Sequence, residues 1–166
     1  KLPGGLGALV PRIQELGLSF GIWVEPEMVN EDSQLYREHP DWAFGAPGRP
    51  HTRGRSQLTL DFSRQDVRDH IYGAIKTVLD SADITYVKWD MNRSLTDVCS
   101  AQLPADRQGE AFHRYTLGVY EMLDRLRRDY PHILIEGCTG GGGRFDAGML
   151  YYTPQIWCSD NTDAID

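Results

Sequence analysis

The sequence YVKWDMNR at residues 86–93 constrains the fold more than any other part of the chain. Its β-branched and aromatic start is typical of a strand. Because alternate side chains of a strand share a face, Lys88, Asp90 and Asn92 are predicted to point the same way. The opposite face is apolar enough to pack against a helix. A lone Lys-x-Asp pair is more often a buried ion pair that stabilises the fold, so a functional interpretation depends on the other strand ends.

Polar residues also end the other predicted strands, which lie at residues 19–24, 57–62, 132–138 and 155–158. These strand-end residues are Glu25, Asp61, Glu136, Cys138 and Asp160. A doubly wound sheet concentrates its site at one switch point, whereas a (β/α)8 barrel collects a residue from nearly every strand. The distribution therefore favours the barrel.

Helical patterns separate the later strands. Apolar residues recur at helical spacing between Val67 and Leu79 and between Phe112 and Leu126, and Ser63 with Asp66 resembles a helix N-terminal cap. A complete barrel needs about 250 residues, and this chain has 166. We therefore expect an α/β fold, a partial (β/α)8 TIM barrel with about five of the eight parallel strands. Residues 1–166 would be a segment of a catalytic barrel domain.

The charge and cysteine content exclude several classes of partner. The net charge of −7 and the pI near 5.2 argue against a nucleic-acid or anionic-membrane surface. No apolar run approaches the roughly 20 residues that cross a bilayer. Three cysteines without a C-x-x-C motif and five scattered histidines indicate neither a disulfide framework nor a metal site. A reducing, cytoplasmic setting is expected.

Asp90 and Asp160 each follow a predicted strand, and a facing pair of carboxyl groups is what glycoside hydrolysis requires. Lys88 is expected to hold Asp90 ionised, as a nucleophile requires. Asp160 would face the Asp90 charge beside aromatic and thiol groups, which favours the protonated form of a general acid. The indole of Trp23 suits stacking on the apolar face of a sugar ring.

The glycine run at residues 140–143 does not match a phosphate-binding loop, because neither a Gly-Lys-Ser/Thr sequence nor a G-x-G-x-x-G register is present. Two interpretations remain: the glycines let the backbone approach a ligand closely, or they form a flexible turn.

Residues 20–28, 86–93, 138–146 and 157–163 together resemble the glycoside hydrolase family 36 α-galactosidases, in the same order along the chain. The resemblance implies a (β/α)8 catalytic barrel and a reaction that retains anomeric configuration without a cofactor. It also implies that Asp90 is the nucleophile and Asp160 the acid/base.

The same resemblance implies that galactose contacts Trp23, Arg55, Lys88, Cys138 and Gly141. Asn92, on the same predicted strand face as Asp90, is a further substrate-binding candidate. The expected substrates carry terminal α-linked galactose, as in raffinose and melibiose. A galactosyl transferase, an α-N-acetylgalactosaminidase and a non-catalytic sugar-binding fragment are the alternatives, and the presence of both aspartates speaks against the last.

The family's paired-aspartate motif of the first barrel strand has no counterpart in this sequence, and the last two strands are missing. We therefore expect the isolated segment to be inactive, and bare strand edges would favour its association. The full-length protein is expected to form a homo-oligomer. In the fold, Asp90 and Asp160 should share the C-terminal rim of the sheet, with Trp23, Lys88 and Cys138 close to them.

Overall fold

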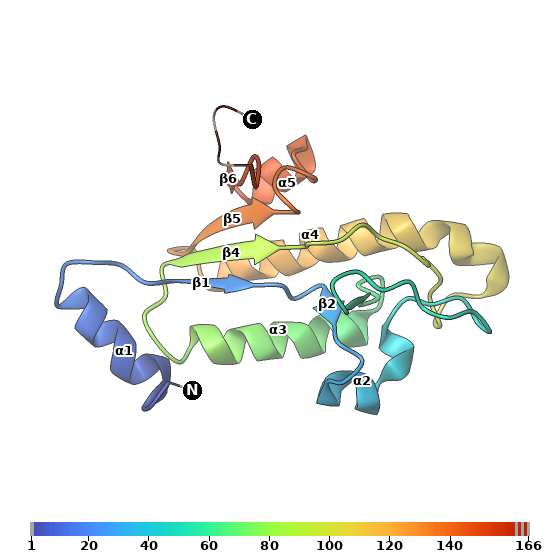
Figure 1. The fold of residues 1–166 in the computed structure, drawn as a ribbon, viewed down its shortest axis with the longest axis horizontal. Helices are drawn as coiled ribbons and strands as arrows, with labels where there is room; N and C mark the ends of the chain where they lie inside the picture. Colours follow the sequence, from blue (N-terminus) through green and yellow to red (C-terminus); the bar gives the residue numbers. More distant parts are fainter. Residues whose placement is uncertain (1, 162, 164, 166) are drawn as a thin grey trace.

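The computed structural model describes residues 2–161, 163 and 165, and among these residues four strands form a parallel sheet (Figure 1). The strands, in their order across the sheet, are β1 (Gly21–Val24), β4 (Tyr86–Asp90), β5 (Leu134–Cys138) and β6 (Gln155–Ile156). The helices between them along the chain are α3 (Gln65–Leu79), α4 (Ala111–Asp129) and α5 (Ala147–Tyr152). The strand order lacks the reversal of a doubly wound sheet and matches part of a (β/α)8 barrel. The predicted α/β class is confirmed.

The predicted strand at residues 57–62 does not join this sheet. Its core, β3 (Leu58–Thr59), pairs antiparallel with β2 (Met28–Val29) in a separate two-stranded sheet. Beyond β3, the Leu60 amide donates to the Glu27 carbonyl at 2.9 Å and extends this local pairing. An apolar hexapeptide specifies a strand but not its partner. The described chain therefore has four parallel strands, one fewer than the sequence suggested.

The remaining helices lie around the ends of the sheet. They are α1 (Gly5–Gln14), α2 (Gln34–Glu38) and the 3-10 helices η1 (Pro40–Trp42) and η2 (Ala105–Glu110). In Figure 1, α1 lies near the start of the strands, whereas β2, α2 and the long loops lie toward their C-terminal ends. The loops thus gather at the edge where parallel α/β folds place their chemistry.

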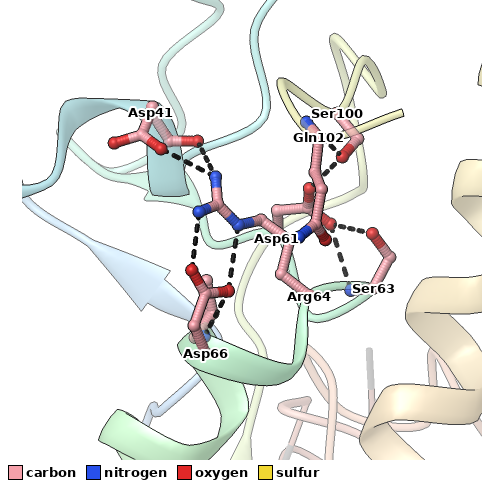
Figure 2. Close-up of polar contacts among 8 residues, drawn as sticks. Asp41, Asp61, Ser63, Arg64, Asp66, Ser100 and Gln102 are labelled. Carbon is pink, nitrogen blue, oxygen red and sulfur yellow. Dashed lines mark hydrogen bonds and ion pairs between the residues drawn. The ribbon is translucent and has the colours of Figure 1, made fainter. Parts of the chain in front are cut away.

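The start of α3 differs from the predicted cap. Arg64, not Ser63, is the N-cap residue, and its side chain makes no cap hydrogen bond. Its guanidinium instead bridges two carboxylates, with Nη1 2.8 Å from Asp41 Oδ2 and Nη2 2.7 Å from Asp66 Oδ2 (Figure 2). Because Asp41 precedes α3 by more than twenty residues, this arginine fixes the β2–β3 excursion to the helix.

Asp61 proves to be a structural anchor. Its side chain is fully buried and accepts hydrogen bonds from the Ser63 amide, the Ser63 hydroxyl and the Ser100 hydroxyl (Figure 2). Ser100 belongs to the loop between β4 and α4. Asp61 therefore stabilises the joining of two loops and is separate from the strand ends of the parallel sheet.

The apolar faces of α3 and α4 cover one face of the sheet (Figure 1). The principal buried residues are Val67, Ile71 and Ile75 from α3, Tyr115, Val119, Met122 and Leu123 from α4, and Val87, Trp89 and Ile135 from the strands. Phe112, which the helical pattern assigned to the apolar stripe, is 56% exposed at the first turn of α4. The burial of Val87 and Trp89 agrees with the predicted alternation along β4, and it leaves Lys88 on the other face.

Two helical glycines provide a matched test of this packing. A methyl group on Gly118 of α4 would lie 2.0 Å from the Phe62 carbonyl oxygen, whereas one on Gly73 of α3 would meet nothing within 4 Å. We expect Gly118→Ala to destabilise the fold by about 1–3 kcal/mol or more through overpacking. Gly73→Ala should stabilise it by about 0.5–1 kcal/mol, because the unfolded chain loses conformational freedom. Thermal unfolding of both variants tests the pair, and equal shifts would contradict the close approach of α4 to Phe62.

Candidate active site

Asp90 is the last residue of β4, and hydrogen-bond donors surround its carboxylate at the C-terminal edge of the sheet. Trp23 Nε1 donates to Oδ2 at 3.0 Å, Asn92 Nδ2 to the same oxygen at 2.7 Å, and the Met91 amide to Oδ1 at 2.8 Å. The neighbouring Cys138 thiol is a further donor that lowers the pKa of this carboxyl group. The register aligns Asp90 directly with Cys138 across the parallel pair. Three predicted site residues thus meet at one aspartate.

Asp90 is only 5% exposed, and its pKa is the result of two opposing effects. Burial raises the pKa, but the surrounding donors lower it by a larger amount, so the net pKa lies below its ordinary value. These donors are Trp23, Asn92, Cys138 and the Met91 amide. The predicted ionised state of Asp90 thus has a physical basis, although the donors that account for it are neutral groups rather than Lys88.

Lys88 pairs with a different carboxylate. Its Nζ lies 3.4 Å from Glu136 Oε1 on β5, and 4.0 Å from the ring centroid of Trp157. Burial and a hydrogen bond to Glu136 raise the pKa of the Tyr86 hydroxyl. On this face of the sheet, Glu136 of β5 therefore connects Lys88 and Tyr86 of β4 to Gln155 of β6, whose side chain also donates to it. The sequence interpretation named Glu136 as a strand-end group but did not pair it with Lys88.

Asp160 makes two contacts with residues at the C-terminal edge of the sheet, one with Trp157 and one with Gly141. Trp157, which stacks on the Lys88 ammonium, donates its indole N–H to Asp160 Oδ1 at 3.0 Å. A Cβ on Gly141 would lie 3.2 Å from the Asp160 amide nitrogen, so the two backbones are in close contact. The Asp160 side chain is exposed. Asp90 and Asp160 therefore belong to the same rim of the sheet, as predicted. Thr162, within the motif at residues 157–163, lies outside the described residues.

The glycine loop after β5 packs against the chain itself. Gly141 has a φ of +81°, and a Cβ there would lie 3.0 Å from Ser159 Cα. A Cβ on Gly142 would lie 2.8 Å from the Cys158 carbonyl oxygen. Burial raises the pKa of the Cys138 thiol, and the Gly141 amide offsets part of that rise. Of the two sequence interpretations, close approach fits, but the partner that approaches these glycines here is the segment around Asp160.

Arg55 reaches the site through a residue that the sequence interpretation did not select as a site residue. Its Nη1 lies 3.6 Å from Glu25 Oε1, and the same oxygen accepts a hydrogen bond from Asn92 Nδ2 at 2.6 Å. Arg55 is 59% exposed at its side chain and has a φ of +53°. Glu25 follows β1 directly, so its place after a strand was the signal available in the sequence.

A second residue that sequence reasoning missed is Glu27, whose side chain is completely buried. It accepts hydrogen bonds from Trp89 Nε1 at 2.6 Å and from the Tyr115 hydroxyl. Arg144 adds two more, from Nη1 at 3.0 Å and from Nη2 at 2.8 Å. Glu27 lies within residues 20–28, which carry the family resemblance, but neither that resemblance nor its neighbours, a proline and two apolar residues, indicated that its side chain would be buried.

A cavity of about 640 Å³ adjoins the site on the side of α4. Asn92 and Arg93 after β4, Thr139 and Arg144 after β5, and Tyr115 of α4 are among its lining residues. Asn92 also contacts Asp90, so it forms a wall that the cavity and the aspartate share. The cavity gives small molecules in solution a route to Arg144.

Two features are absent from the part of the chain that the structure describes. No group of three or more histidine, cysteine, aspartate or glutamate side chains is arranged to hold a metal ion. No helix combines the length and apolar character needed to cross a membrane.

The chain resembles known proteins over its whole length. A model of the Melibiase family matches residues 1–166. The sequence is 59% identical to α-galactosidase AgaA of Geobacillus stearothermophilus over 99% of this chain and 23% of that protein. It is 55% identical to α-galactosidase Mel36A of Lactobacillus acidophilus over 100% of this chain and 23% of that protein.

Solved structures give the same result. The crystal structure of the GH36 α-galactosidase AgaA superposes with a TM-score of 0.97, covering 99% of this chain and 23% of that one. Further structures of AgaA variants are complexes with raffinose and with stachyose. The α-galactosidase TtGalA of Thermus thermophilus, with 24% identity and a TM-score of 0.66 over 95% of this chain and 32% of that one, shares the fold. The chain thus spans about a quarter of the length of the relatives it matches.

The Trp23–Asp90 hydrogen bond predicts how the stability of the fold depends on pH. Trp23→Phe keeps an aromatic ring but removes the donor, which should cost about 1 kcal/mol of stability at neutral pH. Because the folded-state pKa of Asp90 is lowered, the bond stabilises the fold above the ordinary carboxyl pKa of about 4 and loses its effect as pH falls through the folded value. Unfolding measured at about pH 7 and about pH 3 should therefore show a destabilisation that shrinks in acid.

The control is Trp157→Phe, which removes an indole donor from the exposed Asp160. Solvent replaces that hydrogen bond, so its loss should depend little on pH. If Trp23→Phe destabilised the fold equally at both pH values, the indole would not be stabilising the Asp90 charge.

Proposed function

The chain belongs to the Melibiase family, and from that premise we propose that it is a segment of the catalytic domain of a retaining α-galactosidase. The observation that carries the proposal is the Asp90 carboxylate, buried at the C-terminal edge of a parallel sheet among four hydrogen-bond donors, with Asp160 on the same rim. Because the chain spans about a quarter of its relatives, the activity belongs to the full-length protein.

In the proposed mechanism, Asp90 is the nucleophile. A nucleophilic carboxylate must be ionised, and the hydrogen bonds that lower its pKa favour that form. One Asp90 oxygen forms a bond to the anomeric carbon as the bond to the leaving oxygen breaks, which gives a covalent galactosyl ester. The donors Trp23 and Asn92 sit on a single oxygen, Oδ2, and would orient the carboxylate for this attack.

Asp160 would supply and then remove the proton. As the first bond breaks, its carboxylic acid donates a proton to the leaving oxygen, so that the aglycone departs as a neutral alcohol. In the second step, the Asp160 carboxylate takes a proton from water as that water attacks the anomeric carbon and releases Asp90. Its exposure supports the role, because leaving group and water both need access.

The sugar would be held by the residues around these aspartates. We propose that galactose contacts Trp23, Arg55, Lys88, Asn92, Cys138 and Gly141. Trp23 is 49% exposed and so retains free ring surface, and the Lys88 side chain is 24% exposed beside Trp157. The complexes of AgaA with raffinose and stachyose support α-galactosides of this type as substrates. No step of the mechanism needs a cofactor. The cytoplasmic setting and the homo-oligomer stay predictions.

Covalent trapping tests the nucleophile. A 2-fluoro galactosyl inhibitor should label the full-length protein on Asp90, because the fluorine slows hydrolysis of the ester more than its formation. Peptide mass spectrometry identifies the labelled residue. Asp90→Ala should abolish both labelling and turnover. A label on any other residue would overturn the assignment of Asp90.

Removal of the acid should have a graded effect. In Asp160→Ala, substrates with good leaving groups need little protonation, so their first step should stay fast and the galactosyl ester should accumulate. Raffinose, which has a poor leaving group, should lose far more activity. Pre-steady-state kinetics with an aryl α-galactoside and steady-state kinetics with raffinose make the comparison. An equal loss for both substrates would exclude Asp160 as the acid.

A further inference from the structure

Glu27 connects four segments of the chain from a position that solvent does not reach. The residue lies between β1 and β2, and its side chain is 0% exposed. It accepts hydrogen bonds from Trp89 of β4 and Tyr115 of α4, and it forms an ion pair with Arg144 of the β5–α5 loop. A buried carboxylate is stable only with such a complete set of partners. Each partner is thereby fixed relative to the others.

The third guanidinium nitrogen of Arg144, Nε, binds the loop between β5 and α5 to which Arg144 itself belongs. Its Nε donates to Thr139 Oγ1 at 2.7 Å, and the Thr139 hydroxyl donates to the Cys138 carbonyl at 2.7 Å. Thr139 and Arg144 flank the four glycines at residues 140–143. One planar guanidinium therefore binds the buried Glu27 and, at the same time, Thr139 at the start of the glycine loop.

The glycine loop is the part of the site that needs such support. Four successive glycines have no side chains with which to pack, and their backbone is intrinsically free to adopt many conformations. Yet Gly141 and Cys138 must stay side by side, since they line the same small gap as Arg144. The Met91 amide must also reach both the Cys138 carbonyl, at 3.1 Å, and Asp90 Oδ1, at 2.8 Å. The loop also backs the Asp160 segment at Gly141. Both candidate catalytic carboxylates thus depend on the position of this loop.

We infer that Arg144, held by Glu27, is a positioning residue that fixes the glycine loop and, through Gly141 and Cys138, the setting of Asp90. Arg144 contacts neither aspartate, so it would act through the loop alone. The catalytic consequence rests on the proposed function, whereas the fixing of the loop does not. The two are therefore tested by separate measurements.

The experiment uses the full-length protein with two variants and a control. Arg144→Ala removes a guanidinium that lines the 640 Å³ cavity, so free guanidinium ions are tested as its replacement. Glu27→Gln combined with Arg144→Met removes both charges together, so no uncompensated charge is left buried if the single variant folds poorly. Arg125→Ala is the matched control, because Arg125 also pairs with two acidic side chains, Asp69 and Glu121, but on the helices α3 and α4 rather than on the loops at the strand ends. Its side chain is 23% exposed, against 22% for Arg144.

The first measurement is the alkylation rate of Cys138 by iodoacetamide, followed by peptide mass spectrometry. In the wild type this thiol is buried, and Gly141 lies beside Cys138 at the same small gap. We expect alkylation to accelerate by about tenfold or more in both Arg144 variants, because the loop opens locally. Guanidinium at a non-denaturing concentration should slow it again in Arg144→Ala, and Arg125→Ala should react like the wild type. An unchanged Cys138 rate in both Arg144 variants would overturn the inference.

The second measurement is kcat/KM for 4-nitrophenyl α-galactoside, well below the unfolding temperature of each variant. We expect Arg144→Ala to lose about 100-fold, as a misplaced site does, and free guanidinium to restore part of that loss. Arg125→Ala should keep the wild-type kcat/KM even if it unfolds earlier. Equal losses in Arg125→Ala and Arg144→Ala, with no rescue, would reduce Arg144 to a purely structural role. If the wild type itself did not cleave the substrate, the proposed function would fail, and the Cys138 rates alone would decide whether Arg144 fixes the loop.

Discussion

The Asp90 carboxylate is almost completely buried, and the arrangement around it is what makes a charge in that place tolerable. An anion removed from water is costly unless hydrogen bonds replace the lost hydration. Here the replacement comes from an indole, an amide side chain, a thiol and a backbone amide. None of these donors carries a charge. A site built this way keeps Asp90 ionised while leaving Lys88 free to pair elsewhere.

The parallel register is what brings these donors together. The indole comes from β1, the thiol from β5 and the backbone amide from the residue after Asp90, which are far apart in sequence. Parallel neighbours end at the same edge, so each strand presents its last side chains to the strand beside it. The separation of Asp61 from this edge follows from the same rule, since β3 pairs antiparallel in another sheet. A carboxylate at the end of a strand belongs to the site only if that strand belongs to the sheet.

Much of this arrangement could be predicted from the sequence, and the rest could not, for physical reasons. The period of two along residues 86–90 correctly predicted the buried and open faces of β4, because alternation depends only on backbone geometry. The shared rim of Asp90 and Asp160 followed from parallel order. The partner of Lys88 did not, because spacing along one strand is silent about cross-strand neighbours. Lys88 lies beside Glu136 in the register, and that contact replaced the expected one with Asp90.

The burial of Glu27 could not be predicted from the sequence. Its burial depends on three partners that come from β4, α4 and the β5–α5 loop, and no local pattern announces such a convergence. The glycine loop shows the complement: its lack of side chains was visible, but the segment that fills the space was not. The two are coupled through Arg144, which connects the glycine loop to a fully buried carboxylate of the core. The glycines can therefore allow close approach around Asp160 without giving up the fixed position that Cys138 and Asp90 require.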